Sequence, residues 1–155
     1  MLSFIEEVNM KYEIKKLDDD TIVQLVNLSK KWESESCTWG IVANTKDDLV
    51  EPVFVAEDNG VIIGYALGHY YTVEEKTSYI PIGAKCFMLD EIYVLPEYRN
   101  KGIGKELFKL VEKHVINTCK YLTLSTSTKN YKSILHFYVD ELSMTFHSAF
   151  LIKEM

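Results

Sequence analysis

The stretch at residues 86–111, CFMLDEIYVLPEYRNKGIGKELFKLV, constrains the fold of this chain more than any other part of the sequence. An apolar run ends at Leu95-Pro96, and a short basic loop with two glycines follows it. After the loop, apolar side chains recur at the spacing of one helical face, namely Ile103, Leu107, Leu110, Val111 and, with them, His114. This order predicts a strand, a loop and a helix, with the loop leading directly into the helix N-terminus.

The rest of the sequence predicts further strands and helices around this unit. Alternation of apolar and polar residues, or short apolar runs, predict strands at 12–17, 52–57, 61–67 and 120–127, and a long strand or a broken pair of strands at 145–155. Helical spacing and capping residues predict helices at 18–35, 45–49 and 127–142. The polar residues 72–85 predict a long excursion before the central strand. We expect a mixed α/β sheet with helices on both faces.

Length and composition limit the class of protein. The 155 residues fit one domain, 1–155, and 47% hydrophobic with 26% charged residues is ordinary for a globular protein. No apolar run approaches the roughly 20 residues of a membrane helix, and residues 1–10 lack a signal pattern, so we expect these to form an arm or a short helix. A net charge of −6 argues against a nucleic-acid partner. Three widely spaced cysteines indicate reduced thiols in the cytoplasm and no metal site.

The basic loop has two interpretations. Gly102 and Gly104 remove side chains where a phosphate would approach the backbone, and a helix N-terminus offers unpaired N–H groups. Arg99 and Lys101 add positive charge. The loop is therefore either a pyrophosphate cradle or a basic surface turn. Its spacing fits neither a Walker-type loop nor the three-glycine dinucleotide fingerprint.

The stretch LDEIYVLPEYRNKGIGK at residues 89–105 resembles the acetyl-CoA-binding core of the GNAT family of N-acetyltransferases. The order of elements is similar along the chain, and Asn130 with Phe137-Tyr138 resembles the family's Asn…Phe-Tyr stretch. Two departures occur. Leu142-Ser143-Met144 stands where the family has Leu-Gly-Phe, and the intervals from Asn130 to Tyr138 and from Tyr138 to Leu142 are each one residue longer than usual.

The resemblance implies a mainly antiparallel sheet of six to seven strands and a site for acetyl-CoA. The strand ending at Val94 would pair its backbone with the pantetheine arm and supply a backbone donor for the oxyanion. The loop would hold the pyrophosphate. The residues implied in cofactor binding are Ile92, Tyr93, Val94, Arg99, Asn100, Lys101, Gly102, Ile103, Gly104, Lys105 and Asn130.

Two residues are candidates for proton transfer. Glu91 lies on an apolar strand, where burial would raise its pKa toward that of a useful base; its alternative role is to anchor a substrate or to pair with a cation. Tyr138 resembles the family's general acid to the departing thiolate, and its alternative role is in the core. Among the histidines, which show no metal-site spacing, His69 is the one to test as a base.

The acceptor is expected at the corner after the first helix. Trp32, Glu33 and Trp39 lie there, and indoles with carboxylates can hold a cation, although packing and solvation explain them equally well. We predict an acetyl-CoA-dependent N-acetyltransferase that acts on a small-molecule amine or a peptide amine. The sequence leaves open a homodimer, a protein N-terminal or lysine acetyltransferase, and an acyl-CoA-binding or sensing domain without transferase activity.

Overall fold

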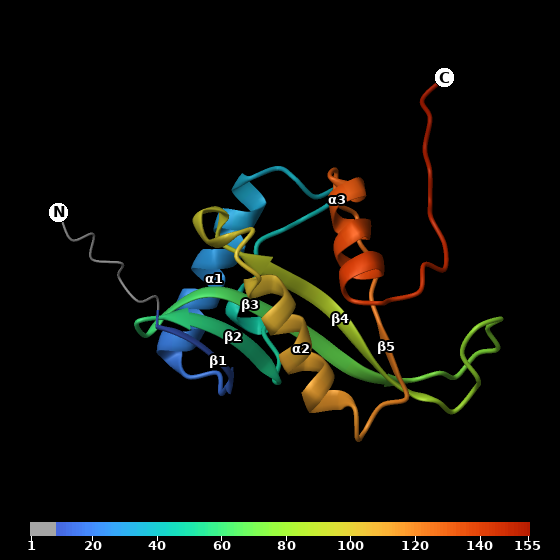
Figure 1. Ribbon diagram of the computed structural model, residues 1–155, viewed down its shortest axis with the longest axis horizontal. Helices are drawn as coiled ribbons and strands as arrows, with labels where there is room; N and C mark the ends of the chain where they lie inside the picture. Colours follow the sequence, from blue (N-terminus) through green and yellow to red (C-terminus); the bar gives the residue numbers. More distant parts are fainter. Residues whose placement is uncertain (1–8) are drawn as a thin grey trace.

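The computed structural model describes residues 9–155, which form one five-stranded sheet in the order β1-β2-β3-β4-β5 (Figure 1). The expected arm or short helix at residues 1–10 lies, for residues 1–8, outside this part. The first four strands pair antiparallel, and β5 runs parallel to β4. The strands are β1 (Met10–Lys15), β2 (Val53–Asp58), β3 (Val61–Thr72), β4 (Lys85–Val94) and β5 (Tyr121–Thr123).

Helices cover both faces of this sheet, as the sequence predicted. On one face, Trp32 of α1 (Asp19–Ser34) stacks on Tyr93 of β4. On the other, His114 of α2 (Ile103–Val115) meets the ring of Phe54 edge-on, and α2 crosses in front of the sheet in Figure 1. A shorter helix, α3 (Tyr131–Leu135), lies beyond β5. No helix within residues 9–155 has both the length and the apolar character needed to cross a membrane.

The amphipathic patterns explain why these elements form and pack. Asp18 caps α1 by accepting a hydrogen bond from the backbone N–H of Thr21 at 2.8 Å. The apolar side of α1 buries Leu25 and Leu28, and that of α2 buries its own row of side chains against β2 and β3. The expected short helix at 45–49 is a single 3₁₀ turn, η1 (Lys46–Asp48), closed by a capping box.

A β-bulge in β4 separates two neighbouring carboxylates. The pairing of β3 with β4 shifts by one residue between Leu67 and Gly68, which leaves Asp90 without a partner residue. Asp90 makes an ion pair with His69 at 2.6 Å, where both side chains are about half exposed. Glu91 instead points to the face that α1 covers, where it accepts a hydrogen bond from Tyr65.

The strands β4 and β5 pair only briefly. Cys86, Phe87 and Met88 pair with residues 121–123, and the strands then diverge (Figure 1). From residue 89 to Val94, β4 therefore keeps its β3 partner on one side and has no strand on the other. The expected strand at 120–127 is correspondingly short, because β5 leaves the sheet after Thr123.

The predicted count of six to seven strands is not met by the described residues, which form five. The difference lies in residues 145–155, expected to be a long strand or a broken pair of strands. They form no strand and extend away from the sheet (Figure 1). A strand needs a partner for its backbone groups, and this segment has none within the described chain.

The last helix absorbs the extra residue that the sequence revealed. Residues His136–Glu141 form a π-helical segment, η3, in which each turn holds about one residue more than an α-helix. The helix then ends at Ser143, whose φ of 58° is left-handed. The N–H of Met144 donates to the carbonyl of Tyr138 at 2.9 Å, which closes the end of the helix. Ser143 thus adopts the conformation for which the family has glycine.

The left-handed conformation of Ser143 predicts a simple stabilisation. A residue with a Cβ pays about 1 kcal/mol in this region, and glycine avoids the penalty. Ser143→Gly should therefore raise the free energy of unfolding by about 1 kcal/mol in an equilibrium denaturant titration. Ser133→Gly, in the exposed part of α3, should lower it by about 0.5 kcal/mol. A loss of stability in Ser143→Gly would contradict the assigned backbone conformation.

Candidate active site

The basic loop presents a continuous row of backbone donors. Within the described chain, the amides of residues 100–105 donate to no backbone carbonyl and no side chain, and the first bond of this region runs from Glu106 N to Gly102 O at 3.1 Å. Asn100 and Gly102 have φ values of 60° and 81°. Alternation of left-handed residues with others turns successive N–H groups to one side, which forms an anion-binding concavity.

The two glycines serve this loop in different ways. A Cβ built on Gly102 would meet nothing within 4 Å, so the space above the loop is open. A Cβ on Gly104 would lie 3.5 Å from Phe137 of η3, in ordinary van der Waals contact. Gly102 is therefore favoured by its left-handed backbone conformation, and Gly104 lies where η3 packs over the start of α2 with room for a Cβ.

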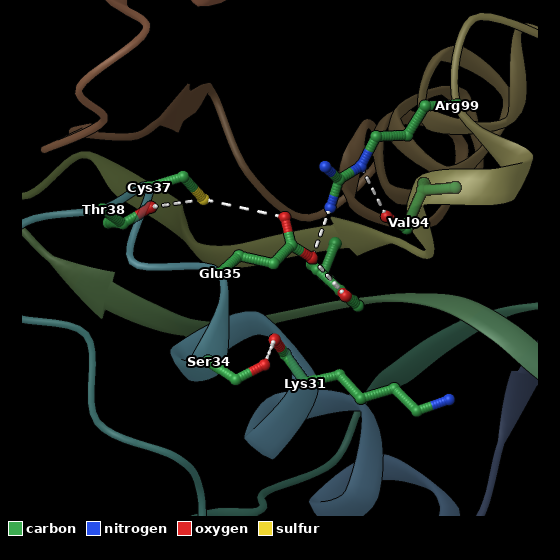
Figure 2. A network of polar contacts seen from close by, with 8 residues as sticks. Lys31, Ser34, Glu35, Cys37, Thr38, Val94 and Arg99 are labelled. Carbon is green, nitrogen blue, oxygen red and sulfur yellow. Dashed lines mark hydrogen bonds and ion pairs between the residues drawn. The ribbon is translucent and has the colours of Figure 1, made fainter.

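The cations of the loop make contacts within the protein. The Nε of Arg99 donates to the carbonyl of Val94 at 2.8 Å, and its Nη2 donates to Glu35 Oε1 at 2.8 Å (Figure 2). The ammonium of Lys101 lies 5.5 Å from the ring centre of Tyr98. Lys105, on the first turn of α2, is half-buried. Arg99, predicted as a phosphate ligand, thus joins the loop to the end of α1.

Glu91 is held by three hydrogen bonds. The amide nitrogen of Asn44 donates to its two oxygens at 3.0 and 2.9 Å, and the hydroxyl of Tyr65 donates to Oε2 at 2.7 Å. The Ser29 hydroxyl accepts the backbone N–H of Asn44 at 2.6 Å and fixes the loop. Burial and the Glu91 carboxylate raise the pKa of Tyr65, so that phenol remains a donor. A carboxylate has about four acceptor positions, so Glu91 retains one.

The second candidate for proton transfer is enclosed on the α2 side. Tyr138 is 8% exposed, and its ring lies 6.2 Å from that of Phe108. Burial raises the pKa of Tyr138, so its phenol keeps its proton at neutral pH. Asn130 begins α3 without a capping hydrogen bond from its side chain, so the capping alternative does not describe it. The structure places Phe137 at Gly104 and Tyr138 against Phe108 of α2, and keeps Glu91 on the opposite face.

The corner after α1, at residues 36–40, contacts the segment that follows β5, where β4 and β5 have separated. Thr38 forms a β-bridge with Thr128, and Trp39 N donates to the carbonyl of Ser127 at 2.9 Å. Trp39 is 68% exposed, and the ammonium of Lys129 lies 4.5 Å from its ring centre. Trp32 packs on Tyr93 with ring centres 5.4 Å apart. This contact corresponds to the packing role that the sequence left open for Trp32 beside cation binding. Glu33 is exposed and makes no side-chain hydrogen bond or ion pair within residues 9–155.

Sequence reasoning missed two residues of this region. Asn44 lies in an irregular loop, and no pattern marks it. Tyr65 is a diagonal neighbour of Glu91 across the β3–β4 pair, but the register that makes it so depends on the bulge at Asp90. Only the alternation in β3, with Tyr65 two residues before Leu67, could have pointed to either of them. Glu35 belongs to the expected acceptor corner, but its contact with Arg99, over a separation of 64 residues, has no signal in the sequence.

Metal chemistry has no visible site here. Among residues 9–155, no group of three or more His, Cys, Asp or Glu side chains could hold an ion. The three cysteines are free thiols, of which Cys86 is buried.

Comparisons with known proteins identify the family to which this chain belongs. The sequence model of the acetyltransferase (GNAT) family matches residues 14–142. An aminoglycoside N-acetyltransferase, AAC(6′)-Iy, in complex with CoA superimposes with a TM-score of 0.65 and 19% identity, over 94% of this chain and 95% of that one. Comparison with curated protein sequences finds no match.

Other solved structures share the same architecture. An aminoglycoside acetyltransferase from an uncultured soil metagenomic sample, in complex with sisomicin, gives a TM-score of 0.65 and 16% identity, over 94% of this chain and 96% of that one. A ribosomal-protein-alanine N-acetyltransferase from Brucella melitensis gives 0.62 and 16%, over 94% and 99%.

The chain belongs to the acetyltransferase (GNAT) family, because the family model covers most of its length. By class it is an acetyl-CoA-dependent N-acetyltransferase, which confirms the prediction from sequence. The open edge of β4 and the amide row of residues 100–105 lie where that prediction put the co-substrate.

Proposed function

We propose that this protein transfers an acetyl group from acetyl-CoA directly to a primary amine, both substrates being bound together. The observation that carries this proposal is the continuity of two unpaired backbone surfaces. The edge of β4 that lacks a strand partner at residues 89–94, where Arg99 occupies only the Val94 carbonyl, leads through a short turn into the free amides of residues 100–105. An extended chain of polar amides that ends in a pyrophosphate matches both surfaces in turn.

The residues of the chain would divide the chemistry as follows. A lysine-like amine has a pKa of about 10.4 and must lose a proton before it attacks. Glu91, with one acceptor position left, takes this proton directly or through a water molecule. The backbone N–H groups of Ile92 and Val94, which strand alternation turns to the open edge, stabilise the developing oxyanion. Tyr138, which stays protonated at neutral pH, donates to the departing thiolate.

The acceptor we favour is a small cation with several amines. The net charge of −6 attracts such molecules, and the carboxylates Glu91 and Glu35 lie on the α1 face, which also carries the corner with the exposed indole of Trp39. The aminoglycoside acetyltransferases among the similar structures act on molecules of this class. A protein N-terminal or lysine acetyltransferase is the alternative, supported by the similar ribosomal-protein-alanine N-acetyltransferase.

A further alternative is a domain that binds acyl-CoA without transfer. Release of free thiol from acetyl-CoA, measured with sisomicin, spermidine and a peptide with a free N-terminus, separates the alternatives. Thiol release with a small amine supports the proposal, and release with the peptide alone favours protein acetylation. Binding of CoA without release for any amine in a broad panel favours the non-catalytic domain. The cytoplasmic location stays a prediction from the sequence.

Substitution of Gly102 tests the cradle. Gly102→Val places a branched side chain in the open space above the loop and should weaken CoA binding at least about tenfold, or about 1.4 kcal/mol, in titration calorimetry. Gly83→Val is the matched control, because Gly83 has the same φ of 81° and equally open surroundings. It should show similar backbone strain and unchanged CoA affinity. Tight CoA binding by the Gly102 variant would refute the cradle.

Two substitutions test proton transfer. Tyr138→Phe and Glu91→Gln should each lower turnover by about 10²-fold or more, since general acids and bases contribute on that scale. CoA affinity should be retained in both, because neither side chain is part of the cradle. Tyr131→Phe, an exposed tyrosine of α3, is the control and should keep full turnover. An unchanged rate in either test variant would remove that residue from the mechanism.

We infer that two copies of the chain pair through residues 145–155. Phe150, Leu151 and Ile152 are each more than 80% exposed, although burying one such side chain is worth about 1.5–3 kcal/mol. The segment is extended and leaves the body of the molecule (Figure 1). β5 pairs with β4 on one side only, so its other edge can receive a strand from a second copy.

Light scattering in solution tests this pairing. The full chain should have the mass of a dimer, and the double variant Phe150→Lys, Ile152→Lys should have the mass of a monomer. Val42→Lys is the control, because Val42 is 75% exposed at a different surface, and its dimer should persist. A monomeric full chain would contradict the proposal.

A further inference from the structure

One ion pair spans the proposed binding regions of both substrates. Arg99 belongs to the loop that precedes the amide row, and Glu35 ends α1 on the face that holds Glu91. The Glu35 side chain is 20% exposed and that of Arg99 is 39% exposed. This contact therefore joins the cofactor loop to the acceptor corner.

The carboxylate of Glu35 is held by one charged and two neutral donors. Its Oε1 accepts the hydroxyl of Tyr93 at 2.6 Å and the Nη2 of Arg99 at 2.8 Å. Its Oε2 has only the weak donor Cys37 Sγ at 3.9 Å. If Arg99 leaves, Tyr93 still holds the side chain in place, and the carboxylate loses the one cation that pairs with it among residues 9–155. Glu35 would then be a preformed site for an ammonium group.

Arg99 has an alternative partner close by. Arg99 directly precedes the free amides of residues 100–105 in the chain, and a pyrophosphate bound there would add negative charge within reach of a long, flexible side chain. Guanidinium groups bind phosphate oxygens through paired N–H donors. Its Nε bond to the Val94 carbonyl lies at the base of the loop and can act as a pivot. A bound pyrophosphate and Glu35 would therefore compete for one guanidinium.

We propose that Glu35 is a specificity residue for the acceptor ammonium and that Arg99 covers it until CoA binds. This inference rests on the function proposed above. Transfer of Arg99 from Glu35 to the pyrophosphate exposes the carboxylate beside Tyr93 and the corner at residues 36–40. By linkage, a cation that takes Glu35 releases Arg99 and strengthens CoA binding by the same factor. The pair then couples the two substrates.

CoA binding measured by calorimetry tests the competition. Glu35→Gln frees Arg99 and should tighten CoA about two- to fivefold, the range expected for a partly exposed ion pair. In the Arg99→Gln background the same substitution should have less than half this effect. Pantetheine, which lacks the pyrophosphate, should bind the wild type and Glu35→Gln equally. Glu97→Gln, an exposed carboxylate of the loop with no contact to Arg99, should have the same effect in both backgrounds.

The possible outcomes distinguish failure of this inference from failure of the proposed function. Weaker or unchanged CoA binding by Glu35→Gln would mean that Glu35 and the pyrophosphate do not compete, and the inference would be wrong. Failure of the wild-type protein to bind CoA would instead overturn the proposed function. With an amine that supports turnover, Glu35→Gln should raise its KM about tenfold with little change in kcat, and an unchanged KM would remove Glu35 from the acceptor site.

Discussion

The brief pairing of β4 with β5 is the constraint on which the site depends. Parallel strands normally satisfy their backbone groups on both sides, but here only residues 86–88 of β4 have a partner on the β5 side. The remaining groups must be satisfied by solvent or by another molecule. The helix α2, which connects the two strands, begins at the same end. The free amides of residues 100–105 therefore continue this edge, so one short strand pairing accounts for both backbone surfaces of the proposed cofactor site.

The two faces of the sheet divide the chemistry. On the α1 face, Glu91 accepts hydrogen bonds from the neutral side chains of Asn44 and Tyr65, whereas Glu35 pairs with the cation of Arg99. The two glutamates therefore have different electrostatic surroundings. On the α2 face, Tyr138 is enclosed by aromatic rings and burial raises the pKa of its phenol. Glu91 and Glu35 thus lie on one side of β4 and Tyr138 on the other, as the proposed division of proton acceptor and donor requires.

The sequence predicted local features well and long-range contacts poorly. The strand, loop and helix at residues 86–111 were recognisable because turn glycines, apolar periodicity and the loop spacing all lie within one short segment. The contact between Arg99 and Glu35 depends on packing between segments 64 residues apart, and no local pattern encodes it. The tail at 145–155 carries the alternation of a strand but lacks a partner within the described chain, and periodicity alone cannot supply one.

The π-helical segment has a consequence for how related chains differ. Deleting one residue from His136–Glu141 would return this turn to ordinary α-helical geometry. Each residue of an α-helix advances by about 100° around the axis, so Phe137 and Tyr138 would rotate by that angle relative to α2. The loss or gain of one residue would then change which of the two aromatic rings packs over the start of α2. Insertion and deletion, as much as substitution, decide which aromatic side chain faces the gap.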